Sequence, residues 1–130
     1  MSARIFGTLP LAHLQLAPNV SSYGYNEDTL TIYDVTNKAS TSIISRTSYT
    51  GASYTHQGWV LDPLNQEYLL LDDEYDEYDK VGPAADGYPV TYIFNIKKLS
   101  KPVLTGYYKS AQKSVDHNQV LAKPSCLRER

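Results

Sequence analysis

Two histidines in this chain are each followed by a side-chain amide, as His56-Gln57 and His117-Asn118. Imidazole and carboxylate groups together suit divalent ions such as zinc, manganese or iron. Carboxylates are available beside the second histidine and in the acidic run LDDEYDEYD. The sequence therefore predicts a divalent-cation site, and its candidate ligands are His56, Asp72, Asp73, Glu74, Asp116 and His117.

The same histidines also have a purely structural interpretation. Each ring can hydrogen-bond a neighbouring backbone through one nitrogen, and a repeated histidine–amide pair needs no metal to explain it. Gln57 and Asn118 are then expected to support the structure beside their histidines. Trp59 is expected to pack between sheets or to line a pocket near the histidine. The sequence favours the structural clamp, and the metal site is the alternative.

The acidic run is a second candidate cation site, in this case for calcium. Calcium takes about six to eight oxygen ligands. The run does not match the helix-loop-helix calcium pattern, because Glu77 stands where glycine is needed and Pro83 stands where glutamate is needed. The sequence therefore favours a solvated acidic loop interleaved with tyrosines, and the calcium site is the alternative.

Evidence for nucleophilic catalysis is scarce. The sequence has no Gly-x-Ser-x-Gly elbow, no Walker loop and no His-Glu-x-x-His motif. Cys126 is the single cysteine, so it cannot form an internal disulfide. The sequence favours a non-enzymatic protein, and its alternative is a hydrolase-like enzyme that uses a metal ion held by the histidines and acids.

Alternation of apolar and polar residues predicts short strands separated by turns, without a convincing helix in the middle of the chain. The predicted strands are 29–35, 43–48, 56–61, 68–71, 89–96, 103–108 and 115–120. The longest irregular segment is 72–88, DDEYDEYDKVGPAADGY. A loop of this length in a compact domain is usually functional or mobile.

An internal repeat appears when the sequence is shifted by 61 positions. TIYDVTNKAS then aligns with YIFNIKKLSK, and His56-Gln57 aligns with His117-Asn118. Each repeat has an apolar strand that ends in Asp or Asn, a polar turn, a second strand, and then histidine followed by an amide. Four short strands per repeat is the layout of a β-propeller blade.

The strands DTLTIYDVT and VTYIFNIKKL resemble LVIVD-type repeats. Together with ASYTHQGW, EYLLLDDEYDEYD and SVDHNQ they closely resemble the choice-of-anchor B family, especially its fungal members. The resemblance covers about residues 22–119. It implies a secreted or surface-associated β-propeller that binds an unidentified protein or small molecule and has no assigned catalytic activity.

The expected fold is therefore all-β, a partial β-propeller with about one complete four-stranded blade and parts of two neighbours. The repeat region is expected to span residues 22–120, after an atypical, disordered or weakly signal-like segment 1–21 and before a tail, 121–130, that departs from the family pattern. Because a closed propeller needs about four blades or more, the resemblance implies a fragment, and a third alternative is that this fragment is not functional alone. Exposed sheet edges predict self-association.

Charge and hydropathy limit the partners. The formal net charge is −2, and nine of the 14 acids but only one of the 12 lysines and arginines lie between Asp62 and Asp86. This distribution argues against nucleic-acid binding, which needs a clustered basic surface. The sequence has no apolar run of membrane-spanning length. The signal-like pattern of the N-terminus is weak, so retention in the cytoplasm is the alternative to export, and Asn19 is a glycosylation site only if the chain is exported.

Overall fold

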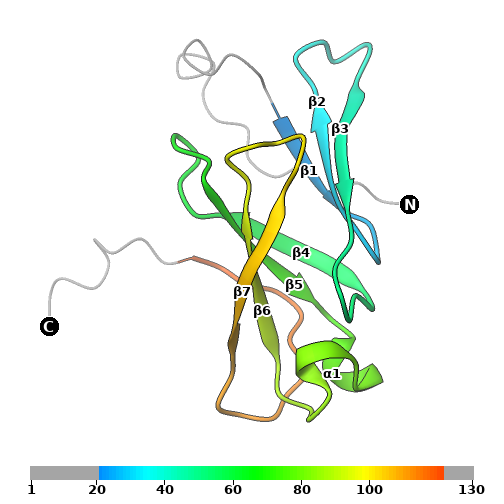
Figure 1. Ribbon diagram of the computed structural model, residues 1–130, viewed down its shortest axis with the longest axis vertical. Helices are drawn as coiled ribbons and strands as arrows, with labels where there is room; N and C mark the ends of the chain where they lie inside the picture. The colour runs from blue at the N-terminus through cyan, green and yellow to red at the C-terminus, as the bar shows by residue number, and fades with distance from the viewer. Residues whose placement is uncertain (1–20, 122–130) are drawn as a thin grey trace, which may run out of the picture.

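The computed structural model describes residues 21–121, and they form two antiparallel sheets (Figure 1). The first sheet has three strands in the order β1-β2-β3. They are β1 (Ser21–Tyr25), β2 (Leu30–Asp34) and β3 (Ser42–Thr47). Each strand is paired with the next one along the chain, so the sheet is a simple meander.

The second sheet has four strands in the order β4-β5-β6-β7, again a meander. The strands are β4 (Thr55–Val60), β5 (Tyr68–Asp73), β6 (Val90–Asn95) and β7 (Val103–Lys109). Between β5 and β6 the chain forms one helical turn, α1 (Asp76–Asp79), and a short 3₁₀ turn, η2 (Gly82–Ala84). These turns make up the β5–β6 connection and lie at one end of the sheet, at the lower right of Figure 1.

The hydrophobic core lies between the two sheets. Alternation along β5 and β6 directs every second side chain toward the first sheet, and those side chains are fully buried with Leu30 and Ile32 of β2. The buried core residues are Leu30, Ile32, Leu69, Leu71, Ala84, Val90, Tyr92, Phe94 and Ile96. The opposite face of the second sheet is called the outer face below; it presents Leu70, Asp72, Thr91 and Ile93.

The predicted repeat is present in the strand pairing. Ile32 pairs with Ser45, and the residues 61 positions later, Ile93 and Gly106, pair in the same way. The register shift after Ile32 recurs after Ile93. A β-bulge inserts one extra residue into one strand and interrupts the regular pairing at that point. The β2–β3 and β6–β7 hairpins therefore share one design.

The turns repeat as well. The Asp34 carboxylate accepts a hydrogen bond from the backbone N–H of Thr36 at 2.9 Å, and the Asn95 amide oxygen accepts one from Lys97 N–H at 3.1 Å. Asp and Asn favour such turns because their short side chains can accept a hydrogen bond from the backbone two residues later. The Asp-to-Asn match in the aligned sequences thus preserves a turn.

Six of the seven predicted strands correspond to β2 through β7, so the all-β prediction is confirmed. The prediction of a strand at 115–120 was wrong: this segment is extended but pairs with no strand. Strand β1 was not predicted, because Ser21, Ser22 and Gly24 weaken the apolar pattern. Its pairing with β2 places it in the sheet nevertheless.

Several predictions concern residues outside the described range. Asn19, the segment 1–20 and the residues from 122 onward, including Cys126, lie outside it. Within residues 21–121 no helix has the length and apolarity that crossing a membrane requires.

Candidate metal centre

His56 is the extra residue of a bulge in β4. Thr55 pairs with Asp73 and Gln57 pairs with Asp72, so His56 has no partner opposite it in β5. A bulge changes the direction of the side chains around it. His56 and Gln57 can therefore both lie on the outer side of the sheet, whereas regular alternation would put them on opposite faces.

Glu74 follows β5 directly and joins the two histidines. Its Oε1 lies 2.7 Å from Nδ1 of His117, and its Oε2 lies 3.4 Å from Nδ1 of His56. One ligand atom from each of the three residues can be chosen so that all three lie within 4.8 Å of one another. Two imidazoles and a carboxylate at this spacing can hold a divalent transition-metal ion.

Aromatic rings support the histidines. The rings of His56 and His117 are stacked with centroids 4.6 Å apart, and Tyr54 stacks on His56 at 6.1 Å. The Tyr54 ring in turn stacks on Tyr75 at 4.9 Å. Such a stack restrains the planes of the rings, and the contacts of both Nδ1 atoms with Glu74 orient the ring nitrogens.

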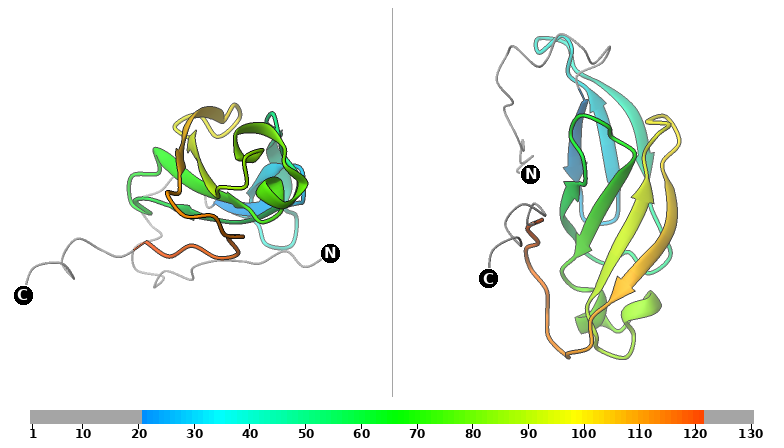
Figure 2. Two further views of the ribbon diagram at one scale, coloured as in Figure 1. Left: turned by 90° about the horizontal axis from the view of Figure 1, so that it is seen from below. Right: turned by 90° about the vertical axis from the view of Figure 1, so that its left-hand side faces the viewer.

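His117 belongs to residues 110–121, named here the strap. The strap follows β7 and returns alongside β4 (Figure 2). Gln57 fastens it with two hydrogen bonds: the Gln57 amide accepts from Gln119 N–H at 2.8 Å and donates to Gln119 C=O at 3.2 Å. Glu77 accepts a further hydrogen bond from Asp116 N–H at 2.8 Å. The strap therefore carries Asp116 and His117 to residues of β4, β5 and α1.

Asp73 lies apart from the metal centre although it was a candidate ligand. Its side chain points between the sheets, where its carboxylate accepts hydrogen bonds from Tyr49 Oη at 2.6 Å and from the N–H groups of Ser53 and Tyr54 at 2.9 and 2.6 Å. Burial raises the pKa of Tyr49 well above its usual range, and the Asp73 hydrogen bond adds to this effect. The structure thus gives Asp73 the role of organising the β3–β4 connection.

The acidic run is largely buried, so the prediction of a solvated acidic loop was wrong for most of its acids. Asp72, Asp76 and Glu77 are between 0% and 4% exposed. Burial raises the pKa of Asp76 to about 8, with a contribution from neighbouring Glu77. Burial also raises the pKa of Asp116 to about 9, and the negative charge of Asp72 is the second cause of this rise. Desolvation disfavours the charged form of each acid.

Asp76 and Glu77 belong to this buried group; the acids of Asp72–Glu77 were candidates together, but these two were not singled out as ligands. Asp76 accepts a hydrogen bond from Tyr92 Oη at 2.6 Å. The sequence signal was available, because the acids continue beyond Glu74, but nothing in the sequence shows that the strap and the helical turn bury them. Among residues 21–121 neither acid has an ion pair with a basic side chain.

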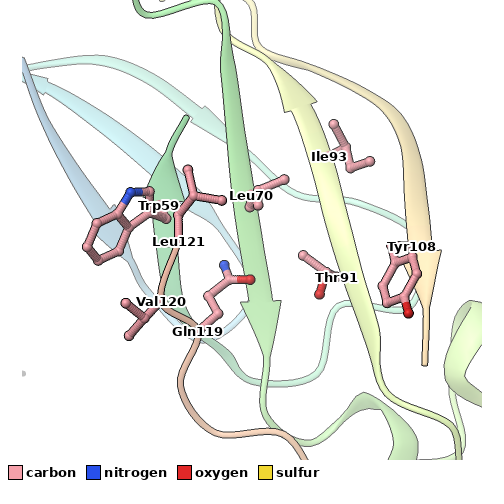
Figure 3. Close-up of a pocket in the computed structure, with 8 residues that line it drawn as sticks. All are labelled: Trp59, Leu70, Thr91, Ile93, Tyr108, Gln119, Val120 and Leu121. Atoms are coloured by element: carbon pink, nitrogen blue, oxygen red, sulfur yellow. The ribbon is translucent and has the colours of Figure 1, made fainter. Parts of the chain in front are cut away.

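Trp59 is not part of the metal centre. It lines an apolar groove of about 200 Å³ on the outer face of the second sheet, with Ile93 and Tyr108 across the groove (Figure 3). Leu70 and Thr91 lie on the intervening strands, and residues 119–121 of the strap form one side. The predicted pocket role of Trp59 is consistent with this position, at a site separate from the histidines.

A second cavity, of about 250 Å³, is polar and includes Asp72, Asp116 and Asn118 in its lining. Neither cavity is lined by His56, Glu74 or His117. The histidine cluster therefore lies outside the lining of these two cavities, and the His117 side chain is 60% exposed.

The fold and the site together define an antiparallel all-β protein of two meander sheets with a His–Glu–His cluster at the strap. Comparison with known family models, with curated protein sequences and with solved structures gives no match to this chain. The resemblance to the choice-of-anchor B family stays a prediction from the sequence.

Proposed function

We propose that this chain is a non-enzymatic binding module built from propeller-type β-repeats, and that its binding site contains a divalent transition-metal ion. The proposal follows the resemblance to the choice-of-anchor B family, which implies action outside the cell or at its surface. The single observation that carries the metal-binding part is the convergence of His56, Glu74 and His117.

The shared design of the two hairpins supports the repeat. In the three-stranded sheet, Ile32 is completely buried against the second sheet. Its equivalent, Ile93, lines the open apolar groove on the outer face of the second sheet. A further sheet of the same repeat packed on that groove would cover Ile93 as the second sheet covers Ile32. This is the relationship between successive blades of a propeller.

The ligand set supports binding of an ion with at least one position left open. Zinc is usually four-coordinate, and three protein ligands leave one place for water or for a group from a partner. His117 is 60% exposed on its side chain, so a partner molecule can approach the ion. A surface metal ion with an open position can bridge this chain to a carboxylate or imidazole of another molecule.

A metal-dependent hydrolase is the second candidate, because two histidines and a glutamate with an open position also occur in catalytic zinc sites. An enzyme usually needs a cavity that surrounds its substrate. The two cavities described above exclude all three ligands. This separation favours the binding module.

Zinc titration by calorimetry tests the proposal. The wild-type chain is expected to bind one zinc ion, and Glu74→Gln and His117→Gln are each expected to weaken binding by about tenfold or more. The matched control is Glu67→Gln, since Glu67 pairs with Lys97 at 3.1 Å outside the site. Equal zinc affinity in Glu74→Gln and wild type would contradict the proposed metal centre.

An activity assay separates the two candidates. The zinc-loaded chain is expected to hydrolyse activated ester and phosphate substrates no faster than free zinc does at the same concentration. Zinc-dependent hydrolysis that is lost in Glu74→Gln and kept in Glu67→Gln would contradict the binding-module proposal and support the hydrolase.

A further inference from the structure

The polar cavity lies between the strap and the outer face of the second sheet. Its volume is about 250 Å³. Oxygen-bearing side chains dominate its lining, and they come from the sheet and from the strap. The lining residues used below are Asp72, Thr91, Ser110, Ser114, Asp116 and Asn118. Histidine and cysteine are absent from this lining, so the cavity differs in chemistry from the His–Glu–His cluster.

Two carboxyl groups meet in this lining. Asp72 and Asp116 lie close enough to hydrogen-bond to each other when one of them carries a proton. Asp72 is only 1% exposed. Its Oδ2 and the Oδ1 of Asp116 are buried and have no hydrogen-bond partner among the described residues. Two neighbouring carboxylates need a shared proton or a cation to offset their repulsion.

The surrounding charges favour a cation. Glu77 accepts a hydrogen bond from the Asp116 backbone N–H, and Asp76 and Glu77 each have a buried carboxylate oxygen without a hydrogen-bond partner among the described residues. Of the described side chains, no lysine or arginine forms an ion pair with Asp72 or Asp116. The imidazole of His56 contacts Glu74 instead, at 3.4 Å. Leaving several carboxylates buried without a counter-charge is costly.

We propose that this cavity binds a calcium ion, with the carboxylates of Asp72 and Asp116 as its charged ligands and with Ser114, Asn118 and water supplying neutral oxygens. Calcium accepts about six to eight oxygen ligands at flexible angles. The cavity has room for a partly hydrated ion. Magnesium is expected to bind more weakly, because it requires strict octahedral geometry and loses its water reluctantly.

The ion would join the strap to the sheet. Asp72 belongs to β5, whereas Asp116, Ser114 and Asn118 belong to the strap. Calcium would therefore add to the attachment already made by Gln57. This inference is independent of the proposed zinc site, which uses nitrogen ligands and Glu74.

Calorimetric titration with calcium, and terbium luminescence sensitised by the nearby Tyr108 ring, test the inference on the full chain. Wild type is expected to bind one calcium ion and to lose about tenfold or more in affinity on Asp116→Asn or Asp72→Asn, because each variant removes one charged ligand. The matched control is Asp86→Asn. Asp86 lies outside the cavity and pairs with Lys109 at 2.8 Å, so its replacement is expected to leave calcium affinity unchanged.

Zinc provides both a folding check and a separation from the proposed function. Asp116→Asn that still binds zinc is folded with its strap in place, so loss of calcium alone supports the cavity as the site. His117→Gln is expected to lose zinc and to keep calcium. The inference is overturned if wild type binds no calcium at about 5 mM, above the roughly 0.1–1 mM range of extracellular calcium modules. Unchanged affinity in both aspartate variants would overturn it as well.

Discussion

The imidazole rings of His56 and His117 are stacked 4.6 Å apart with an angle of 25° between their planes. The separation of 61 residues is also the interval between the β2–β3 and β6–β7 hairpins. Equivalent positions of two repeats thus meet, and Glu74 lies against both of them. The cluster consequently fastens the strap to the sheet even without a metal ion.

Glu74→Gln is expected to loosen the strap of the metal-free protein, because a neutral amide replaces the carboxylate that joins the histidines. The effect on global stability should be below about 1 kcal/mol, since His117 is 60% exposed and water screens the interaction. Local opening is a more sensitive readout. Hydrogen exchange of strap amides should accelerate in Glu74→Gln and not in Glu67→Gln. Equal exchange in the two variants would contradict the fastening role.

Much of the fold could be predicted from the sequence because its signals are local. The turns after Asp34 and Asn95 rest on side chains that bond their own backbone, and alternation identified β2 through β7. Strand formation at 115–120 also depends on a partner strand, and the described part of the chain provides none. The same reasoning explains β1, whose weak pattern is compensated by pairing with β2.

The candidate site was predictable in residue type but not in arrangement. His56, Glu74 and His117 were proposed together, and the structure brings them together. Asp73 was proposed with them, but the alternation of β5 turns it to the other side of the sheet, toward Tyr49. The burial of Asp72 depends on the strap and its long-range contacts. No local pattern in the acidic run specifies it.

Stability is expected to decrease as pH rises from about 4 to about 9. Asp76 and Asp116 have folded pKa values of about 8 and about 9, above the usual 3.8. The folded chain therefore binds more protons than the unfolded chain between these limits, so the stabilising contribution is complete at acidic pH and is lost as pH rises. Urea unfolding midpoints at about pH 5, 7 and 9 would measure the trend. Rising midpoints would contradict it.

Asp76→Asn provides the variant for this trend, because its amide cannot ionise and its oxygen can still accept the Tyr92 hydrogen bond. Its midpoint should fall less steeply with pH than that of wild type. Asp86→Asn is the control, because Lys109 lowers the pKa of Asp86 and this acid is exposed. The slope of the control should remain close to that of wild type in this range. A parallel slope in Asp76→Asn would exclude Asp76 as a source of the trend.

Gly58→Ala is expected to destabilise the fold by about 1–3 kcal/mol through overpacking. An added Cβ at Gly58 would overlap the Tyr25 ring, which connects the first sheet to β4. Gly106→Ala is the matched control in strand β7, where an added Cβ meets no atom within 4 Å. Urea unfolding of both variants should show a loss only for Gly58→Ala. Similar stabilities would mean that the Tyr25 ring can move away without cost.

Self-association is expected to involve the free edge of β7. This strand pairs with β6 on one side only, and Tyr107 is 52% exposed. An exposed strand edge with apolar side chains is a template for pairing with another chain, and lysine on an edge opposes it by charge. Tyr107→Lys should therefore reduce concentration-dependent association in sedimentation velocity. Tyr78→Lys is the control, because this substitution adds the same charge at a site away from a strand edge. Tyr78 lies on α1 and is 75% exposed. Equal reduction by both variants would assign the effect to net charge, and association unaffected by Tyr107→Lys would exclude this edge.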